Sequence, residues 1–292
     1  MKKIRLLVKT KSKKYPIIIG SDIINQINYL LNSNNINFEK SLIVFDKNVP
    51  KKKLNIIKQK LKTKKNIVHI FNANEKNKNF KSINLILNKL FKFNFNRNDC
   101  IISLGGGITG DVSGFAASIY KRGIKFVNIP TTLLAQIDSS IGGKTGVNSI
   151  YGKNLIGSFS QPKLVICDTS FLKSLKKKEM ICGYAEILKH AVIKDKKFFD
   201  WLKVNTKSIL QHHPKKLIYA IKKSCSIKLQ FVNKDTDEKN YTRDGNSSNQ
   251  NSIIKQVEFT DGVVTLLEDT LLPGDVRMVI GVEITELKKR ED

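Results

Sequence analysis

Gly105-Gly106-Gly107-Ile108-Thr109-Gly110-Asp111 is the stretch that decides the fold. It follows a short apolar run, Cys100 to Leu104, that is typical of a buried strand, and it precedes a segment of helical character, Asp111 to Tyr120. Glycines let the backbone reach positive φ and approach a ligand closely, and the first free N–H groups of a helix face a phosphate. Gly105, Gly107 and Gly110 also have the G-x-G-x-x-G spacing of dinucleotide-binding loops. The stretch predicts a phosphate-binding loop, with a tight turn that holds no ligand as the alternative.

A row of polar groups continues downstream of this loop. The next apolar run, Lys125 to Ile129, ends in Pro130-Thr131-Thr132-Leu133-Leu134, and Asp138, Gly142-Gly143-Lys144-Thr145 and Gly152-Lys153-Asn154 follow. In the usual dinucleotide fold the glycine loop lies in the first βαβ unit, with an acidic residue about 20 positions later. Here the loop comes late, so we interpret it as a nucleotide loop outside the standard Rossmann order, followed by polar groups around a small anionic substrate.

Strand and helix patterns alternate along the first part of the chain. Apolar runs predict strands at 4–7, 15–19, 41–45, 66–71 and 163–167, and helical spacing predicts helices at 53–61 and 83–91. This alternation predicts an α/β fold whose N-terminal domain, residues 1–175, is Rossmann-like, with a mainly parallel sheet and helices on both faces. Asp46, Glu75 and Lys78 follow strand ends and should face the same crevice as the glycine loop. Solvated loop-end charges are the alternative for each of them.

A helical pattern begins near residue 176 and predicts a second domain over residues 176–239. Its helices are expected at 180–194, 198–209 and 214–232. Glu186, Lys189 and His190 lie three and four positions apart and therefore share one helix face. A carboxylate and an amine on that face could bind a divalent metal and a phosphate, whereas an ordinary surface ion pair is the alternative.

Composition limits the classes of function. The 292 residues carry a formal net charge of +27, with 40% hydrophobic residues. Because the lysines are scattered through nearly every segment and form no focused basic stripe, we expect a small-molecule substrate and no nucleic-acid partner. No run approaches 18 apolar residues and the N-terminus intersperses basic residues, so we expect a cytoplasmic protein with no membrane partner.

The run from Gly105 through Asn154, continued by Gly183-Tyr184-Ala185-Glu186-Ile187-Leu188-Lys189, resembles the 3-dehydroquinate synthases, a family of the sugar-phosphate cyclases related to glycerol dehydrogenases. The resemblance extends over roughly residues 1–235. It implies conversion of a seven-carbon keto sugar-acid phosphate, DAHP, into 3-dehydroquinate and phosphate in the shikimate pathway of aromatic amino acid biosynthesis. It also implies NAD as a retained hydride carrier, a divalent metal (zinc or cobalt), and a homodimer.

The same resemblance assigns roles to individual residues. The NAD-binding positions it implies are Asp46, Glu75, Lys78, Gly105, Gly106, Gly107, Gly110, Asp111, Thr131, Thr132, Leu134, Lys144 and Lys153. The catalytic and substrate-binding positions it implies are Asp138, Lys144, Lys189, Lys228, Asn154 and Arg122, the last reaching the phosphate from the neighbouring subunit. Glu186 matches a metal ligand, whereas His190 matches no ligand position, and His69, His212 and His213 are interpreted as surface or packing residues.

The last part of the chain departs from the family. The family continues with L-N-x-G-H-x-x-x-H and H-G-E segments, which supply two histidine metal ligands and a general acid/base histidine, but this chain has no histidine after His213. Residues 241–292 carry six basic and ten acidic residues, against the strongly basic remainder. We therefore expect a truncated helical domain followed by an atypical tail, residues 240–292, for which a frameshift, a fusion and an appended β-rich module remain open alternatives. A polar linker at 240–251 and short strands at 257–267 and 276–284 with a turn at 272–275 are expected in it.

Three hypotheses remain open at this stage. The first is a 3-dehydroquinate synthase, the second a related metal-dependent polyol dehydrogenase, and the third a catalytically impaired NAD-binding remnant. The lysines at the expected site suit a phosphorylated acid and disfavour the second, whereas the missing histidines favour the third. Replacement ligands from Asp235, Asp237, Glu238 or Asp244 are conceivable, although their spacing matches no recognisable metal site.

Overall fold

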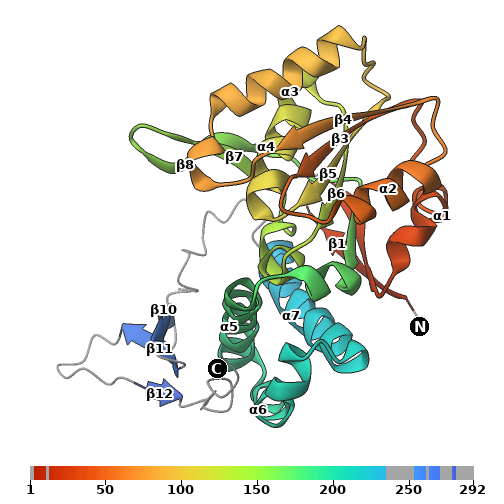
Figure 1. Cartoon of the computed structure of the whole chain (residues 1–292). Helices are drawn as coiled ribbons and strands as arrows, with labels where there is room; N and C mark the ends of the chain where they lie inside the picture. The colour runs from red at the N-terminus through yellow and green to blue at the C-terminus, as the bar shows by residue number, and fades with distance from the viewer. Residues whose placement is uncertain (1–2, 11–12, 235–252, 261–262, 270–277, 281–292) are drawn as a thin grey trace, which may run out of the picture.

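The computed structural model describes residues 3–10, 13–234, 253–260, 263–269 and 278–280. Its main sheet has seven strands in the order β1-β2-β9-β6-β5-β3-β4. Figure 1 shows β3 beside β4, with β5 and β6 next to them. Its strands are β1 (Ile4–Lys9), β2 (Lys14–Gly20), β3 (Lys40–Asp46), β4 (Lys65–Phe71), β5 (Cys100–Gly105), β6 (Lys125–Pro130) and β9 (Leu164–Asp168). Only the β1–β2 pair is antiparallel, and all other neighbours in this sheet are parallel. The mainly parallel α/β sheet predicted from the sequence is therefore confirmed.

Helices cover both faces of this sheet because successive residues of its strands point to opposite sides. Ile43 and Phe45 of β3 face a core shared with α1 (Ile27–Asn32) and α2 (Lys51–Lys60). Leu42 and Val44 face the opposite core. That second core is completed by α3 (Phe80–Lys92) and α4 (Gly107–Ile119).

Three further helices pack on the β1–β2–β9 side of the sheet. They are α5 (Lys177–Lys194), α6 (Lys196–Leu210) and α7 (Pro214–Lys234). Their apolar faces share one core with Ile17 and Ile19 of β2 and with Leu133 and Ile137 of the segment after β6. The helical segments expected at 180–194, 198–209 and 214–232 are confirmed, whereas a domain division near residue 175 stays a prediction.

A β-hairpin that the sequence analysis missed projects from the sheet domain. It consists of β7 (Lys144–Ser149) and β8 (Gly152–Phe159), which pair antiparallel. The sequence predicts no strand here because glycines and polar residues mask the strand pattern. Gly146 and Gly157 face each other across the hairpin, and a Cβ on Gly157 would lie 2.1 Å from the carbonyl oxygen of Thr145, so the glycines permit the strands to pair.

Two sequence expectations need correction. Helix α4 begins at Gly107, four residues before the expected start at Asp111, so the glycine loop itself forms the first turn. In the tail, the single strand expected at 257–267 is replaced by β10 (Ile253–Thr260) and β11 (Val263–Asp269), which pair antiparallel, and β12 (Met278–Ile280) joins β11. The expected linker at 240–251 and turn at 272–275 lie outside the described residues.

Candidate functional site

The glycine loop lies at the carboxyl end of β5, where the N-terminus of α4 begins. The N-cap is Gly106, and Gly110 donates the first intrahelical bond, to the Gly106 carbonyl oxygen at 3.0 Å. The N–H groups of the preceding turn therefore have no intrahelical acceptor and can bind an anion. The buried carboxylate of Asp46, at the end of β3, lies beside this loop. Burial raises the pKa of Asp46, and hydrogen bonds from Asn48 and Gly106 offset part of that effect.

This loop needs glycine because neighbouring atoms lie close to its backbone, and not because its residues have positive φ. This finding corrects one part of the sequence argument. Among the described residues, positive-φ glycines occur at 123, 142, 143 and 152, and none lies in the 105–110 loop. A Cβ on Gly105 would lie 2.4 Å from Thr109 Oγ1 and 2.8 Å from Asp46 Cβ, and one on Gly107 would lie 2.8 Å from Ser139 Oγ. The loop therefore needs glycine because neighbouring side chains approach its backbone closely.

The end of the next strand, β6, lies beside the glycine loop. Thr131 N–H donates to the Gly105 carbonyl oxygen at 2.9 Å, and Thr132 lies against Gly106. A small pocket is lined by Gly110, Asp111 and Lys144, among others. The structure thus brings several predicted NAD-binding positions together at the ends of β5 and β6 and around this pocket.

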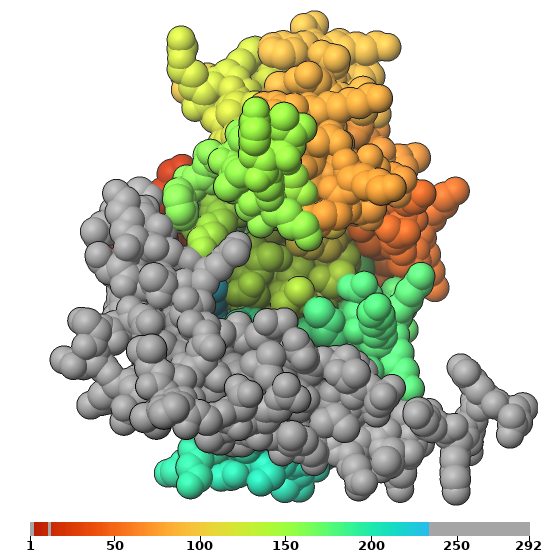
Figure 2. Space-filling view, turned by 90° about the vertical axis from the view of Figure 1, so that its left-hand side faces the viewer, coloured from red at the N-terminus to blue at the C-terminus, as the bar shows by residue number. Residues whose placement is uncertain are grey.

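Lys78 forms the centre of a second group of predicted residues. Lys78 is only 6% exposed. Its ammonium group pairs with Asp111 and donates to Asn154 Oδ1 at 2.5 Å. Glu75 accepts a hydrogen bond from Asn148 at 2.7 Å, so both acidic and basic residues of the 74–78 segment hold the hairpin. Figure 2 shows the light-green hairpin lying against the orange segment that contains Glu75 and Lys78.

Burial raises the pKa of Asp111 to about 6, although the charge of Lys78 and its hydrogen bond act in the opposite direction. The carboxylates of Glu75 and Asp138 raise this pKa further. Asp111 therefore connects the Lys78 group electrostatically with a third group of residues around Asp138.

The third group lies where the helices meet the sheet domain. Asp138 lies in the π-helical turn η4 (Ala135–Ser139), Glu186 and Lys189 lie on α5, and Lys228 lies on α7. Lys189 pairs with Glu186 at 2.7 Å, and Lys228 pairs with Asp138 at 2.8 Å. Four predicted residues from three separate parts of the sequence are thus neighbours in space.

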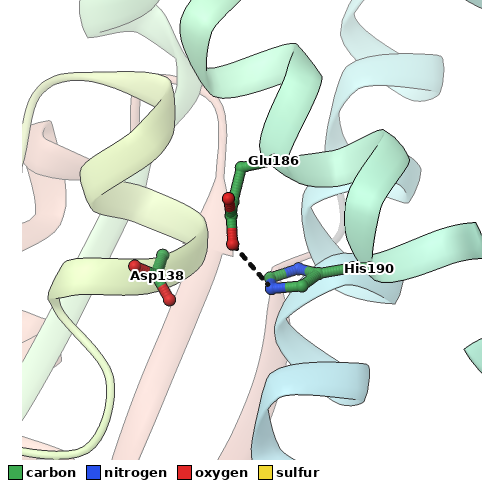
Figure 3. A group of neighbouring side chains, drawn as sticks. All are labelled: Asp138, Glu186 and His190. Atoms are coloured by element: carbon green, nitrogen blue, oxygen red, sulfur yellow. Dashed lines mark ion pairs between the residues drawn. The ribbon is translucent and has the colours of Figure 1, made fainter. Parts of the chain in front are cut away.

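His190 is the member of this group that the sequence analysis missed. It was assigned no role, yet its side chain lies beside Glu186, with Nε2 3.3 Å from Glu186 Oε1 (Figure 3). Asp138, Glu186 and His190 each offer one ligand atom, and these atoms lie within 4.8 Å of one another. The four-residue spacing between Glu186 and His190 was the available sequence signal. Burial raises the pKa of Glu186, but hydrogen bonds from His190 and Lys189 outweigh it and hold this pKa at about 2.

Two predicted residues lie apart from these groups. Arg122 follows the C-terminal end of α4, whereas the glycine loop forms its N-terminal end, and a helix of 13 residues is about 20 Å long. Lys153 is exposed near the tip of the hairpin. Asp235, Asp237, Glu238 and Asp244, considered as replacement metal ligands, lie outside the described residues.

Gly183 sets the distance between α5 and the segment that carries Asp138. A Cβ at Gly183 would lie 2.6 Å from Leu133 Cβ and 2.7 Å from the Leu134 backbone nitrogen. The Gly-Tyr-Ala-Glu motif at 183–186 thus combines a close helix contact with the candidate metal ligand one turn later.

We therefore expect Gly183→Ala to lower the free energy of unfolding by about 1 to 3 kcal/mol, because the Leu133 Cβ and the Leu134 backbone nitrogen cannot move aside unless the backbone of that segment shifts. A glycine-to-alanine change inside a helix ordinarily stabilises by about 1 kcal/mol, so the sign itself is diagnostic. Urea unfolding followed by circular dichroism measures the effect. Cys182→Ala, at the exposed neighbouring position, is the control and should change little. A gain in stability for Gly183→Ala would contradict the prediction.

The fold and the site together define the class of protein. It is an α/β protein whose glycine loop follows the carboxyl end of a sheet strand, and in which two carboxylates and a histidine lie together between the sheet and the helices. The model described as 3-dehydroquinate synthase N-terminal matches residues 68–182, and that described as 3-dehydroquinate synthase C-terminal matches residues 183–244. A 3-dehydroquinate synthase of Pelagibacter ubique is 58% identical over 238 residues, covering 80% of this chain and 64% of the relative. That of Bartonella quintana is 42% identical, covering 79% and 63%. The chain belongs to the 3-dehydroquinate synthase family.

Solved structures agree with this assignment. A 2-deoxy-scyllo-inosose synthase complexed with carbaglucose-6-phosphate, NAD+ and Co2+ has a TM-score of 0.74 at 26% identity, covering 81% of this chain and 64% of that one. A 2-epi-5-epi-valiolone synthase from Streptomyces hygroscopicus with NAD+ and Zn2+ bound has a TM-score of 0.68 at 27% identity, covering 77% and 62%. The chain spans less than two thirds of the length of these relatives. Among the described residues, no helix combines the length and apolar character needed to cross a membrane.

Proposed function

We propose that this chain binds NAD and a phosphorylated keto sugar acid and acts as a 3-dehydroquinate synthase, converting DAHP into 3-dehydroquinate and phosphate in the cytoplasm. The observation that carries the proposal is the convergence of Asp138, Glu186, Lys189 and Lys228 next to Ser139, which lies against Gly107 of the glycine loop. Carboxylates there can hold a cation and orient hydroxyl groups, while two lysines can bind phosphate and carboxylate.

The residues around the glycine loop fit NAD. The glycine loop leaves backbone N–H groups at the start of α4 for the pyrophosphate, and Asp46 offers a carboxylate beside it for a ribose. Lys78 and Asp111 join this region to the hairpin through Asn154. We assign NAD-binding roles to these residues and to Glu75, Thr131, Thr132, Leu134, Lys144 and Lys153. When bound, NAD would supply the hydride acceptor for oxidation of a substrate hydroxyl.

The chain's own groups then position the substrate. Lys189 and Lys228, each paired with a carboxylate in the structure, would exchange that partner for an anionic end of the substrate. Asp138 would hold a substrate hydroxyl, and Asn154 would contribute an amide beside the phosphate. A divalent metal held at Glu186 would polarise the oxidised hydroxyl. The fit of that site to a metal rests on the three ligand atoms of Asp138, Glu186 and His190.

Arg122 enters this proposal through a homodimer. Because it lies at the far end of α4 from the glycine loop, it would reach a phosphate in the partner subunit's cleft and not in its own. This arrangement is part of the proposed function.

An assay of the purified chain separates the three hypotheses. Phosphate release from DAHP that requires NAD supports the proposed function. Accumulation of NADH from glycerol or a related polyol, with no phosphate release from DAHP, would favour a polyol dehydrogenase. NAD binding without either reaction would indicate a catalytically impaired remnant, which the lack of any histidine after His213 favours.

We expect Gly107→Val to weaken NAD binding at least about 10-fold. The valine side chain would occupy the space in front of the N–H groups at the start of α4, and its Cβ would lie 2.8 Å from Ser139 Oγ. Titration calorimetry measures the dissociation constant. Ile119→Val, at the exposed C-terminal end of the same helix, is the matched control and should bind NAD like the unchanged chain. Equal affinity in Gly107→Val would place NAD elsewhere.

A further inference from the structure

We propose that this chain holds one divalent transition-metal ion between Asp138, Glu186 and His190. This ligand set differs from the one that the family resemblance implies, in which the glutamate is joined by two later histidines. The inference deepens the proposed function and rests on it for the role of the ion, but binding itself is measured without substrate or NAD.

The ligand atoms already have much of the spacing that such an ion requires. In a tetrahedral site with metal–ligand bonds of about 2.0 to 2.2 Å, ligand atoms lie roughly 3.3 to 3.6 Å apart. Glu186 Oε1 and His190 Nε2 are separated by 3.3 Å. All three ligand atoms lie within 4.8 Å of one another, so Asp138 needs a shift of no more than about 1.5 Å to complete the set.

The environment of His190 fits a metal ligand better than a packing residue. The residue is 5% exposed, and its Nδ1 lies 2.6 Å from Ser224 Oγ on α7. Without an ion, Nε2–H donates to Glu186; with an ion bound, the Nδ1–H would donate to Ser224 Oγ and Nε2 would give its lone pair to the ion in place of that hydrogen bond. Metal-binding histidines are oriented in this way by an oxygen on the second ring nitrogen. Figure 3 shows the His190 ring and the Glu186 carboxylate approaching each other from successive turns of α5, with Asp138 facing them from η4.

Charge points to a cation at the same place. The carboxylates of Asp138 and Glu186 lie close together and are balanced in the structure by Lys228 and Lys189, at 2.8 and 2.7 Å. A divalent ion neutralises both carboxylates and thereby frees the two lysines for an anionic ligand. Two carboxylate oxygens and one imidazole nitrogen suit zinc, cobalt or manganese, and three protein ligands leave the open position of a catalytic site.

Titration of the full chain with Co2+ tests the proposal, followed by calorimetry and by the visible absorption of the bound ion. We expect one Co2+ per chain, at least about 10-fold weaker binding in His190→Gln, and weaker binding in Ser224→Ala, because loss of an orienting partner typically costs 10- to 100-fold in affinity. His213→Gln, at an exposed histidine, is the matched control and should bind Co2+ like the unchanged chain. Asp138→Asn, at a partly exposed side chain, provides a second ligand variant if His190→Gln fails to fold.

Three results would overturn the proposal. They are no stoichiometric Co2+ binding by the unchanged chain, unchanged affinity in folded His190→Gln and Asp138→Asn, and an equal loss of affinity in His213→Gln. Stoichiometric Co2+ binding that depends on His190, together with no NAD-dependent phosphate release, would support the metal site while refuting the proposed function.

Discussion

Purified chain supplied with NAD, Co2+ and DAHP should release phosphate at least about 100-fold more slowly than the relative from Pelagibacter ubique. The chain has no histidine after His213, whereas the family resemblance implies a general acid/base histidine in that part of the sequence. Loss of a general acid or base typically costs 10²- to 10⁴-fold in rate. The metal site inferred above supplies ligands but no replacement proton donor, so it does not remove this limit. A coupled phosphate assay with both proteins at equal concentration measures the ratio.

Two variants, Glu186→Gln and its control Lys64→Met, test whether the residual phosphate release depends on the cation site. Glu186→Gln should remove the residual NAD-dependent release, because it weakens the cation site, whereas Lys64→Met, in an exposed ion pair just before β4, should leave it unchanged. Turnover within about 10-fold of the relative, lost in Glu186→Gln, would contradict the prediction and show that another group of this chain performs the proton transfer.

Lys78→Met should lower the free energy of unfolding by about 3 kcal/mol near pH 8. The substitution leaves Asp111 without its ammonium partner, and removing one member of a buried pair typically costs about 3 to 5 kcal/mol. The lower end of that range applies because the Asp111 side chain retains 20% exposure. Chemical unfolding followed by circular dichroism measures the loss. Lys64→Met breaks the exposed pair with Glu39, whose side chains are 74% and 63% exposed, and should change the free energy by less than about 1 kcal/mol.

The loss in Lys78→Met should depend on pH with a defined sign. Burial already raises the pKa of Asp111 to about 6 from its ordinary value of 3.8, and removal of Lys78 raises it further. Because the pKa in the folded state lies above that in the unfolded state, the folded state binds the proton more tightly. The loss is therefore absent below about pH 6, where Asp111 is protonated in both folded proteins, grows as the pH rises from the pKa of Asp111 in the unchanged chain to its higher pKa in the variant, and is constant above that. A loss that stays constant from acidic to alkaline pH would exclude Asp111 as its cause, and so would a Lys78→Met/Asp111→Asn double variant as unstable as the single one.

The sheet could be predicted from the sequence because its strands bury both faces. Continuous apolar runs such as Cys100 to Leu104 have one plausible environment, a strand between two helical layers. The hairpin at 144–159 could not be predicted in the same way. β8 is mostly exposed, β7 is mostly half-buried or buried, and both carry glycine where the two backbones meet, so the apolar alternation that identifies a strand is absent.

The role of the loop glycines was also decided by tertiary contacts. Sequence reasoning attributed them to positive φ, but Gly105 and Gly107 are required by Thr109, Asp46 and Ser139, which come close from other elements. Spacing in the sequence carries no information on these contacts, because they depend on how α4 and η4 approach the end of β5.

The sequence by itself determined the mainly parallel α/β sheet, the glycine loop between β5 and α4, and the shared helix face of Glu186 and Lys189, because these depend on local periodicity and on neighbours within a few residues. Only the tertiary structure decided which of the distant polar residues form groups. Asp138 joins Glu186 because Gly183 lets α5 approach η4, and Lys78 joins Asp111 because α3, which follows Lys78, packs against α4 through Phe80 and Phe115. The tertiary structure also decided that His190 belongs with the carboxylates, because the ring is oriented by Ser224 on α7, 34 residues further along the chain. Contacts of this kind arise from the packing of helices on the sheet, which no single segment encodes.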